Sequence, residues 1–218
     1  MKTRNGLLVV ALIYLIVYAS LIISLNDETF FNREFSKLNV YSDFQNESLV
    51  NAKNQEIIGY IQGNVKNLDL QFFNQKEISH MQDVKNIFFR LKIISIIAIL
   101  LVVIILGEMV WKNKLIKNIF RILVAIVSGE ILLGAILAAI IFLNFEKAFI
   151  IFHQLLFSNN NWLLDPTADN LIRMYPQDFF VDITLEIIAK IGLITGILLF
   201  IAISLKIIDK MRSKKHLL

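Results

Sequence analysis

The sequence contains no cysteine and only two prolines. Without cysteine the chain has no disulfide, no thiol nucleophile and no site at which it could itself be a lipid-modified lipoprotein. It also lacks G-x-S-x-G, the elbow motif of many serine hydrolases, and the zinc-binding pattern H-E-x-x-H. Both prolines, Pro166 and Pro176, fall in one polar segment, which indicates a loop shaped by fixed turns.

Long apolar runs dominate what is present. Hydrophobic residues make up 56% of the chain, against roughly 45 to 50% in soluble domains. Four runs are long enough to cross about 30 Å of hydrocarbon as helices; they cover about 6–25, 93–111, 122–143 and 183–205. The first run is about twice as long as a signal-peptide core and no small-residue cleavage site follows it, so we expect it to remain as a helix. We therefore predict an all-α polytopic membrane protein, a single membrane domain over residues 1–218 with four transmembrane helices.

Lysine and arginine gather at the ends of these runs. They precede the first run, lie between the second and third, and follow the fourth, which is the positive-inside pattern of a protein with both termini in the cytoplasm. Two segments, at about 26–90 and 144–180, are then expected to be extracytoplasmic. The basic ends account for the net charge of +4, and no basic patch interleaved with aromatics indicates a nucleic-acid partner. We expect a monomer.

The outer segments carry helical signals of their own. Apolar residues from Leu49 to Ile61 repeat at helical spacing before Gly63, which predicts a short helix with a glycine stop. Asn74 and Glu77 form a capping-box pattern, so we predict a helix that runs without a break into the second membrane span. The apolar part of the second outer segment is too short to span the membrane. It predicts an interfacial or re-entrant helix followed by a polar loop.

Three histidines are present, and two of them fall at the depth of the outer membrane surface. His80 has Glu77 and Asp83 three residues away on either side, so both carboxylates can flank the imidazole on one helical face. His153 lies in the middle of the apolar stretch FIIFHQLLF. The third, His216, belongs to the basic tail and is expected to be inert.

The residues alone leave several interpretations of these histidines open. The pair could bind a metal with further carboxylate ligands, for which the candidates are Glu77, Asp83, Asp165 and Asp169. It could instead act as a general acid and base, because imidazole titrates near neutral pH. Each histidine taken singly is also explained as an interfacial residue whose nitrogens bind the backbone or water.

Polar and small residues inside the predicted membrane helices indicate further contacts. Glu130 lies at membrane depth, and Lys190 could pair with it or with Glu186. The small-residue patterns GAILA, from Gly134, and GLITG, from Gly192, predict close packing of the third and fourth helices. The charges leave an alternative function open, a non-enzymatic transporter or sensor with partner-binding outer loops, although no inverted repeat supports a transporter.

Two stretches of the outer segments carry a likeness to a known family. EISHMQDV (77–84) and FHQLLFSNNNWLLDPTADNLIRMYPQDFF (152–180), on a frame of four membrane helices, resemble the bacterial lipoprotein intramolecular transacylases. The resemblance implies an enzyme that moves the sn-2 acyl chain of a diacylglyceryl-modified cysteine onto the α-amino group of that cysteine, which gives a lyso-form lipoprotein. Its partners would be diacylglyceryl-modified bacterial lipoproteins and membrane lipid, with the active site at the outer leaflet and no cofactor or metal.

The resemblance also implies roles for individual residues. His80 and His153 would carry protons as general acid and general base. The supporting or substrate-binding residues would be Glu77, Asp83, Trp162, Asp165, Asp169, Arg173 and Tyr175. Arg173 or a backbone amide would stabilise the oxyanion. From the residues alone, Asp165 is equally a turn former before a proline and Trp162 an interfacial anchor.

Overall fold

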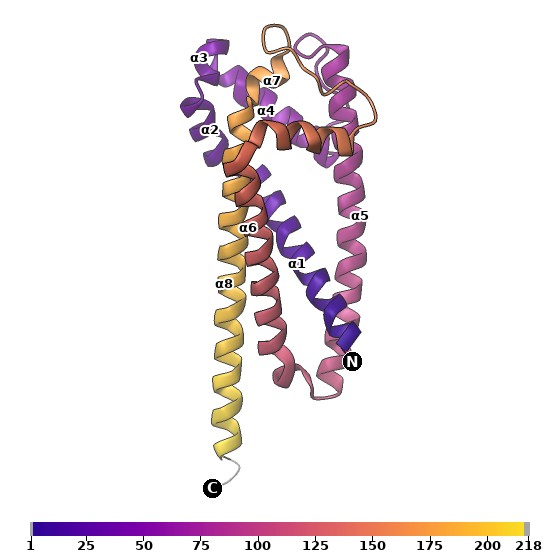
Figure 1. Cartoon of the computed structure of the whole chain (residues 1–218), viewed down its shortest axis with the longest axis vertical. Helices are drawn as coiled ribbons and strands as arrows, with labels where there is room; N and C mark the ends of the chain where they lie inside the picture. The colour runs from indigo at the N-terminus through magenta and orange to yellow at the C-terminus, as the bar shows by residue number, and fades with distance from the viewer. Residues whose placement is uncertain (1, 216–218) are drawn as a thin grey trace. The chain divides into compact units, whose positions relative to one another are not determined.

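The computed structural model describes residues 2–215, and every regular element in that range is a helix. Figure 1 follows the chain from α1 to α8. The helices are α1 (Lys2–Leu25), α2 (Glu28–Lys37), α3 (Val40–Phe44), α4 (Glu47–Gln62), α5 (Gln75–Trp111), α6 (Leu115–Leu156), α7 (Asn170–Met174) and α8 (Gln177–Lys215). His216, which was expected to be inert, lies outside the described residues.

Four helices between residues 2 and 215 are long and apolar enough to cross a membrane. The candidate spans are Thr3–Leu25, Gln75–Trp111, Asn118–Leu156 and Gln177–Ile208. Each contains one of the apolar runs seen in the sequence, so the predicted all-α membrane protein with four spanning helices is confirmed. The 37 residues of α5 extend about 55 Å at 1.5 Å per residue, which exceeds the roughly 30 Å of hydrocarbon.

Contacts divide the chain into two compact units. The first contains the residues up to Leu21, Ile94–Ile136 and the residues from Ile187 onward; the second contains Ile22–Ile93 and Leu137–Glu186. All the site residues implied by the family resemblance belong to the second unit. The single membrane domain expected from the sequence stays a prediction.

The first unit has a core of aliphatic side chains from α1, α5, α6 and α8. Its buried members include Leu8, Ile16, Val102, Met109, Ile126 and Ile191. Lipid tails are as apolar as these side chains, so membrane helices associate through close packing and polar contacts rather than through exclusion of water. The positions at which the backbones approach closely therefore matter for the stability of this unit.

The small-residue patterns do not form the contact that the sequence predicts. A Cβ added at Gly134, Gly192 or Gly196 would meet no heavy atom within 4 Å. The prediction that they pack the third and fourth helices together is wrong, because a small-residue pattern marks a helix face without showing that another helix covers it. The close approach occurs at Gly129 instead, where an added Cβ would lie 2.6 Å from Cδ1 of Ile13. The tight contact of α6 is thus with α1.

Glu130 of α6 has a hydroxyl partner on α8. The Thr195 hydroxyl donates to this carboxylate and lies 2.9 and 2.8 Å from its two oxygens. A hydrogen-bond donor lowers the cost of placing a carboxyl group at membrane depth. In the second unit, Glu186 lies 3.7 Å from the guanidinium of Arg33. The pairing of Glu130 with Lys190 stays a prediction.

An aromatic core holds the second unit together. Phe30, Phe31, Phe35 and Tyr175 surround Phe179, with ring centroids 5.1 to 6.1 Å from that of Phe179. The short helix α3 contacts α2, α4 and α7. Because aromatic pairs at these distances gain free energy beyond their buried area, the cluster fixes the first turn of α8 against α2.

Two helix boundaries in the second unit confirm sequence predictions. Gly63 follows α4 in the left-handed conformation, with φ of 86°, and so provides the expected stop. At the start of α5, the backbone amide of Asn74 donates to the Glu77 carboxylate at 2.7 Å. The amide of Glu77 donates in return to the Asn74 side chain at 3.1 Å. This capping box opens a helix that continues unbroken to Trp111.

The last part of α6 forms the separate helix that the sequence predicts. The backbone leaves the helical conformation at Asn144, with φ of −170° and ψ of 87°. The Asn144 side chain then accepts a hydrogen bond from the amide of Lys147 at 2.9 Å and so caps a new segment. Figure 1 shows the helix turning sharply at this point. Residues 145–156 carry His153 and lead into the polar loop.

Candidate active site

His80 of α5 and His153 of α6 face each other in the second unit. Their ring centroids lie 6.0 Å apart, with 37° between the ring planes. Both residues are buried, with exposed fractions of 8% and 7%. Two histidines that the sequence places only at similar depth are therefore neighbours in one site.

Aromatic rings enclose His153. Ring centroids of Phe149, Trp162 and Phe157 lie 4.2, 5.0 and 5.6 Å from that of His153. Its Nδ1 lies 2.7 Å from the backbone carbonyl oxygen of Phe149. A carbonyl only accepts hydrogen bonds, so Nδ1 carries the proton of the neutral ring and Nε2 is its basic nitrogen. The apolar stretch thus fixes both the orientation and the tautomer of the histidine.

His80 has a different environment. Phe157 packs edge-on against its ring, with 4.9 Å between centroids. Its Nδ1 is buried and has no hydrogen-bond partner in the part of the chain that the structure describes. A buried nitrogen without a partner costs free energy, and the fold carries that cost at His80.

The carboxylates next to His80 in sequence hold the following segments in place. One oxygen of Glu77 accepts from the Asn74 amide, and the other accepts from the backbone amide of Leu171 at 2.6 Å. Asp83 accepts from the side-chain amide of Asn159 at 2.8 Å. Glu77, which was expected to be able to flank the imidazole, therefore binds backbone amides rather than the ring. Helical spacing predicts the face of α5 correctly but cannot show that another segment binds there.

The segment after α6 is tied to the start of α5 along its length. The tied pairs are Asp83 with Asn159, Ser79 with Asn161, Lys76 with the carbonyl of Leu163, Asn74 with Asp169, and the carbonyl of Phe72 with Asn170. The order along α5 is opposite to the order along the segment. We call this set of hydrogen bonds the α5 ladder. It fixes the loop that carries Trp162 against the helix that carries His80.

Asp165 and Asp169 close the turn that contains the first proline. The backbone amide of Asp165 donates to the Asp169 carboxylate at 2.7 Å. The Asp165 carboxylate accepts from the hydroxyl and the amide of Thr167, at 2.7 and 2.8 Å. These hydrogen bonds from Thr167 hold the pKa of the exposed Asp165 carboxyl below its usual value. The contacts agree with the interpretation of Asp165 as a turn former.

Arg173 and Tyr175 contact the short helices of the second unit. The Arg173 guanidinium donates to the Asn170 side chain at 3.1 Å and lies over the Phe44 ring, 4.5 Å from its centroid. The Tyr175 hydroxyl donates to the side-chain carbonyl of Asn54 at 2.7 Å, and burial raises the pKa of the phenol. Both residues thus position α7 and the start of α8. Stabilisation of an oxyanion by Arg173 stays a prediction.

Within residues 2–215, no three histidine, aspartate or glutamate side chains gather in a group that could hold a metal ion. The carboxylates considered as ligands bind amide and hydroxyl groups instead; they are Glu77, Asp83, Asp165 and Asp169. The metal interpretation of the histidine pair therefore lacks a set of ligands among these residues.

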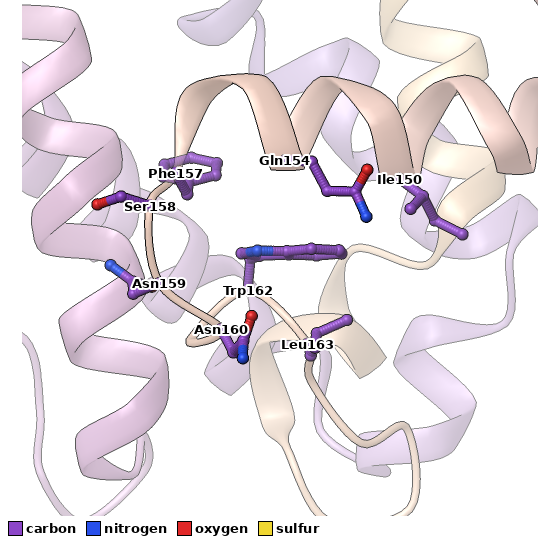
Figure 2. Close-up of a pocket in the computed structure, with 8 residues that line it drawn as sticks. All are labelled: Ile150, Gln154, Phe157, Ser158, Asn159, Asn160, Trp162 and Leu163. Carbon is purple, nitrogen blue, oxygen red and sulfur yellow. The ribbon is translucent and has the colours of Figure 1, made fainter.

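A pocket of about 290 Å³ opens beside His153. It is lined by Ile150, Gln154, Phe157, Ser158, Asn159, Asn160, Trp162 and Leu163. Figure 2 shows the ring of Trp162 between the helix that carries Gln154 and the loop that carries Asn160. Every lining side chain is uncharged, and Trp162 and Phe157 contact both the pocket and the His153 ring.

Sequence reasoning missed the amide side chains of the site. Asn159 and Asn161 join the loop to α5, and Gln154 lines the pocket. The available signal was the run SNNN directly after an apolar helix, because short amide side chains bind nearby polar groups readily. The same run is typical of an ordinary loop, so the sequence alone does not reveal which groups it binds.

The family model for the lipoprotein intramolecular transacylase Lit matches residues 6–180. The chain belongs to this family. Solved structures with the same fold include the membrane integral transacylase Lit from Bacillus cereus, with a TM-score of 0.83 and 22% identity over 96% of this chain and 97% of that one. A variant of the same Bacillus cereus protein, with a histidine replaced by arginine, has a TM-score of 0.80 over 98% of this chain and 94% of that one, at 22% identity.

A more similar sequence is known from another bacterium. An uncharacterised protein of Aquifex aeolicus (strain VF5) is 32% identical over 126 residues, which is 58% of this chain. The match spans about half the length of that relative, 54% of it. The family model and the solved structures together identify this chain as a multi-pass membrane protein of the transacylase family.

Proposed function

We propose that this transacylase moves the sn-2 acyl chain of a diacylglyceryl-modified cysteine onto the α-amino group of the same cysteine. Its substrates are diacylglyceryl-modified lipoproteins in the membrane, and its products are lyso-form lipoproteins. Membership of the family supports the class of reaction. The single observation that carries the assignment to a site is the buried pair of His80 and His153, with ring centroids 6.0 Å apart.

The proposed reaction forms one bond and breaks one. The amine nitrogen attacks the ester carbonyl carbon, the new amide C–N bond forms, and the C–O bond to the glyceryl group breaks. The proton lost by nitrogen goes to the glyceryl oxygen. Donor and acceptor belong to one substrate molecule, so the enzyme needs no nucleophile of its own. A chain without cysteine and without G-x-S-x-G is compatible with this chemistry.

His153 is the residue best suited to carry the proton. Its Nδ1 is bound to the carbonyl of Phe149, which leaves Nε2 to take the proton from the amine and return it to the departing oxygen. An α-amino group has a pKa near 8, so part of it is already neutral at neutral pH. His80, whose ring centroid lies 6.0 Å from that of His153, is the second group proposed to act, as a donor of an N–H hydrogen bond to the reacting ester. General acid and base catalysis of this kind contributes about 10²-fold to 10⁴-fold.

Holding the ester and the amine together supplies the remaining acceleration. A well-oriented intramolecular pair reaches an effective molarity of about 10⁵ M or more, worth on the order of 7 kcal/mol. The rings around His153 provide walls for such a pair, and the α5 ladder keeps the loop with Trp162 beside α5. Rigid walls and a fixed loop are the features that this kind of catalysis requires.

The acyl chains have an apolar surface beside the histidines. In residues 145–156, His153 is buried, whereas Phe152 and Leu156 are exposed and Leu155 has an exposed fraction of 80%. A helix that buries a polar group on one side and exposes apolar side chains on the other is suited to the membrane interface. We place this helix in the outer leaflet, with both termini of the chain in the cytoplasm.

Mass spectrometry of a diacylglyceryl lipopeptide tests the proposal. Purified wild-type enzyme, with chelator present and no added cofactor, should move one acyl group from the glyceryl oxygen to the cysteine nitrogen. His153→Ala and His80→Ala should abolish most of the conversion, whereas His216→Ala serves as the matched control in the basic tail. Full activity of His153→Ala would reject the mechanism. No transfer by the wild type would favour a non-enzymatic protein, and loss with chelator would favour a metal site.

A further inference from the structure

The pocket beside His153 has a feature that acyl transfer itself does not require. Gln154 and Asn160 present side-chain amides to it from two different walls, with the Trp162 ring between them (Figure 2). Both amide side chains are exposed, and neither forms a hydrogen bond with another residue in the described part of the chain. Their donors and acceptors are therefore available to a ligand.

The chemistry of the lining selects among the parts of the substrate. No charged side chain lines the pocket, so it lacks the cation that would hold an anionic headgroup. An acyl chain would bury the amides of Gln154 and Asn160 against hydrocarbon, which costs free energy. A peptide main chain offers one N–H donor and one carbonyl acceptor at each residue, which matches a side-chain amide that carries both.

The position of the pocket agrees with this choice. Trp162 forms a wall of the pocket and lies 5.0 Å from His153 between ring centroids. Consecutive Cα atoms are about 3.8 Å apart. If the amine of the lipidated cysteine lies at His153, the next residue of the substrate comes within reach of the pocket. Because the α-amine of this cysteine is free, the substrate peptide continues only from the carbonyl of the cysteine.

We propose that the pocket bounded by Gln154, Asn160 and Trp162 binds the main chain of the first one or two residues after the lipidated cysteine. This inference rests on the proposed function. The volume of about 290 Å³ lies at the lower end of ligand pockets, which suits a short stretch of main chain. Binding through the main chain lets one enzyme process lipoproteins whose side chains differ after the cysteine.

Two substrates test the assignment. One is S-diacylglyceryl-cysteine methyl ester, which has no peptide bond, and the other is the same cysteine followed by two glycines and a C-terminal amide. The quantity measured is the ratio of kcat/KM for the tripeptide to kcat/KM for the ester. The wild type should prefer the tripeptide. Gln154→Leu and Asn160→Leu should each lower the ratio about fivefold through a higher KM, the scale of one lost neutral hydrogen bond.

Gln75→Leu is the matched control, because Gln75 is an exposed glutamine of the same unit that does not line the pocket. It should keep the wild-type ratio. Gln154→Ser and Asn160→Ser replace the leucine variants if those lose thermal stability. Equal use of both substrates by the wild type, or a ratio that the pocket variants leave unchanged, would overturn the pocket assignment alone. Conversion of neither substrate by the wild type would overturn the proposed function and the pocket with it.

Discussion

His153 has one ring nitrogen fixed by the carbonyl of Phe149, whereas Nδ1 of His80, in the ring 6.0 Å away, has no hydrogen-bond partner among the described residues. The difference separates a side chain with a defined tautomer from one whose tautomer no hydrogen bond at Nδ1 fixes. It also means that removal of the His80 imidazole sacrifices no hydrogen bond at Nδ1. The stability of the fold and the activity of the site should therefore respond differently to substitution.

His80→Ala and His153→Ala should each lower kcat/KM by roughly 10² or more, the scale of a lost general acid or base. Initial rates from mass spectrometry and thermal unfolding should be measured on the same preparations. We expect the melting temperature of His80→Ala to stay closer to that of the wild type than the melting temperature of His153→Ala, which loses the hydrogen bond to the Phe149 carbonyl. A loss of activity that follows a loss of folded protein would instead assign the histidine a structural role.

Glu77→Gln should destabilise the second unit. The buried carboxylate accepts from the amides of Asn74 and Leu171, and an amide side chain would direct an NH₂ group at one of these donors. Hydrogen bonds to charged groups contribute about 1.5 to 3 kcal/mol, so the free energy of unfolding should fall by about that much. Chemical unfolding followed by tryptophan fluorescence measures it. Glu47→Gln, at an exposed position, is the control, and equal effects of the two changes would contradict the structure.

Gly129→Leu should lower the stability of the protein, whereas Gly192→Leu should leave it unchanged. A side chain at Gly129 would meet Ile13 of α1, so overpacking should cost about 1 to 3 kcal/mol. At Gly192 an added Cβ meets nothing within 4 Å, so that variant should unfold like the wild type. Thermal unfolding in detergent compares them. A stable Gly129 variant beside an unstable Gly192 variant would restore the contact between α6 and α8 through these glycines, which the structure contradicts.

Tyr175→Phe tests whether Tyr175 acts in catalysis or in the fold. The change removes the donor to Asn54 and leaves a buried carbonyl oxygen without it, at a cost of about 1 to 3 kcal/mol. We expect lower stability and an unchanged kcat for the enzyme that remains folded. A hundredfold lower kcat with normal stability would assign the hydroxyl a direct role in the reaction.

Labelling of single cysteines tests the orientation in the membrane. The chain has no cysteine of its own, so Lys66→Cys, Asn160→Cys and Lys114→Cys each provide a unique and exposed thiol. An impermeant reagent applied to spheroplasts should label the first two and spare the third. The reverse pattern would place both termini outside and the histidines in the cytoplasm.

The sequence predicts the helices well because their signals are local. Run length alone identifies the four spanning helices, and the caps at Asn74 and Gly63 need only residues within four positions. The uncovered face of Gly192 could not be predicted in this way, because it depends on which helix lies opposite. The spacing of small residues in the sequence shows that they share one face of a helix. Whether that face is buried depends on the helix that packs against it.

The residue types of the site could be predicted from the sequence, but the hydrogen-bond partners of these residues could not. His153 stands out in the sequence as a lone imidazole in an apolar stretch and His80 as an imidazole between two carboxylates, and the family motif includes both. Glu77 was expected to flank the imidazole, and the structure shows that its carboxylate accepts from the backbone amide of Leu171, which is far away in sequence. Contacts of that kind depend on the path of a whole loop, and no local pattern of residues encodes it.

The α5 ladder can form only late in the synthesis of the chain. One set of the hydrogen-bonding groups of this ladder lies at residues 72–83, and the other lies at residues 159–170. The second set emerges from the ribosome only after the membrane crossings of α5 and α6, which lie between the two sets in the chain. His153 and Phe157, whose rings lie beside that of His80, precede these groups in the chain. Domains fold as their segments are completed, and contacts between distant segments form last. A nascent or truncated chain that ends before residue 159 thus contains both histidines but lacks Trp162 and the hydrogen bonds that hold its loop on α5.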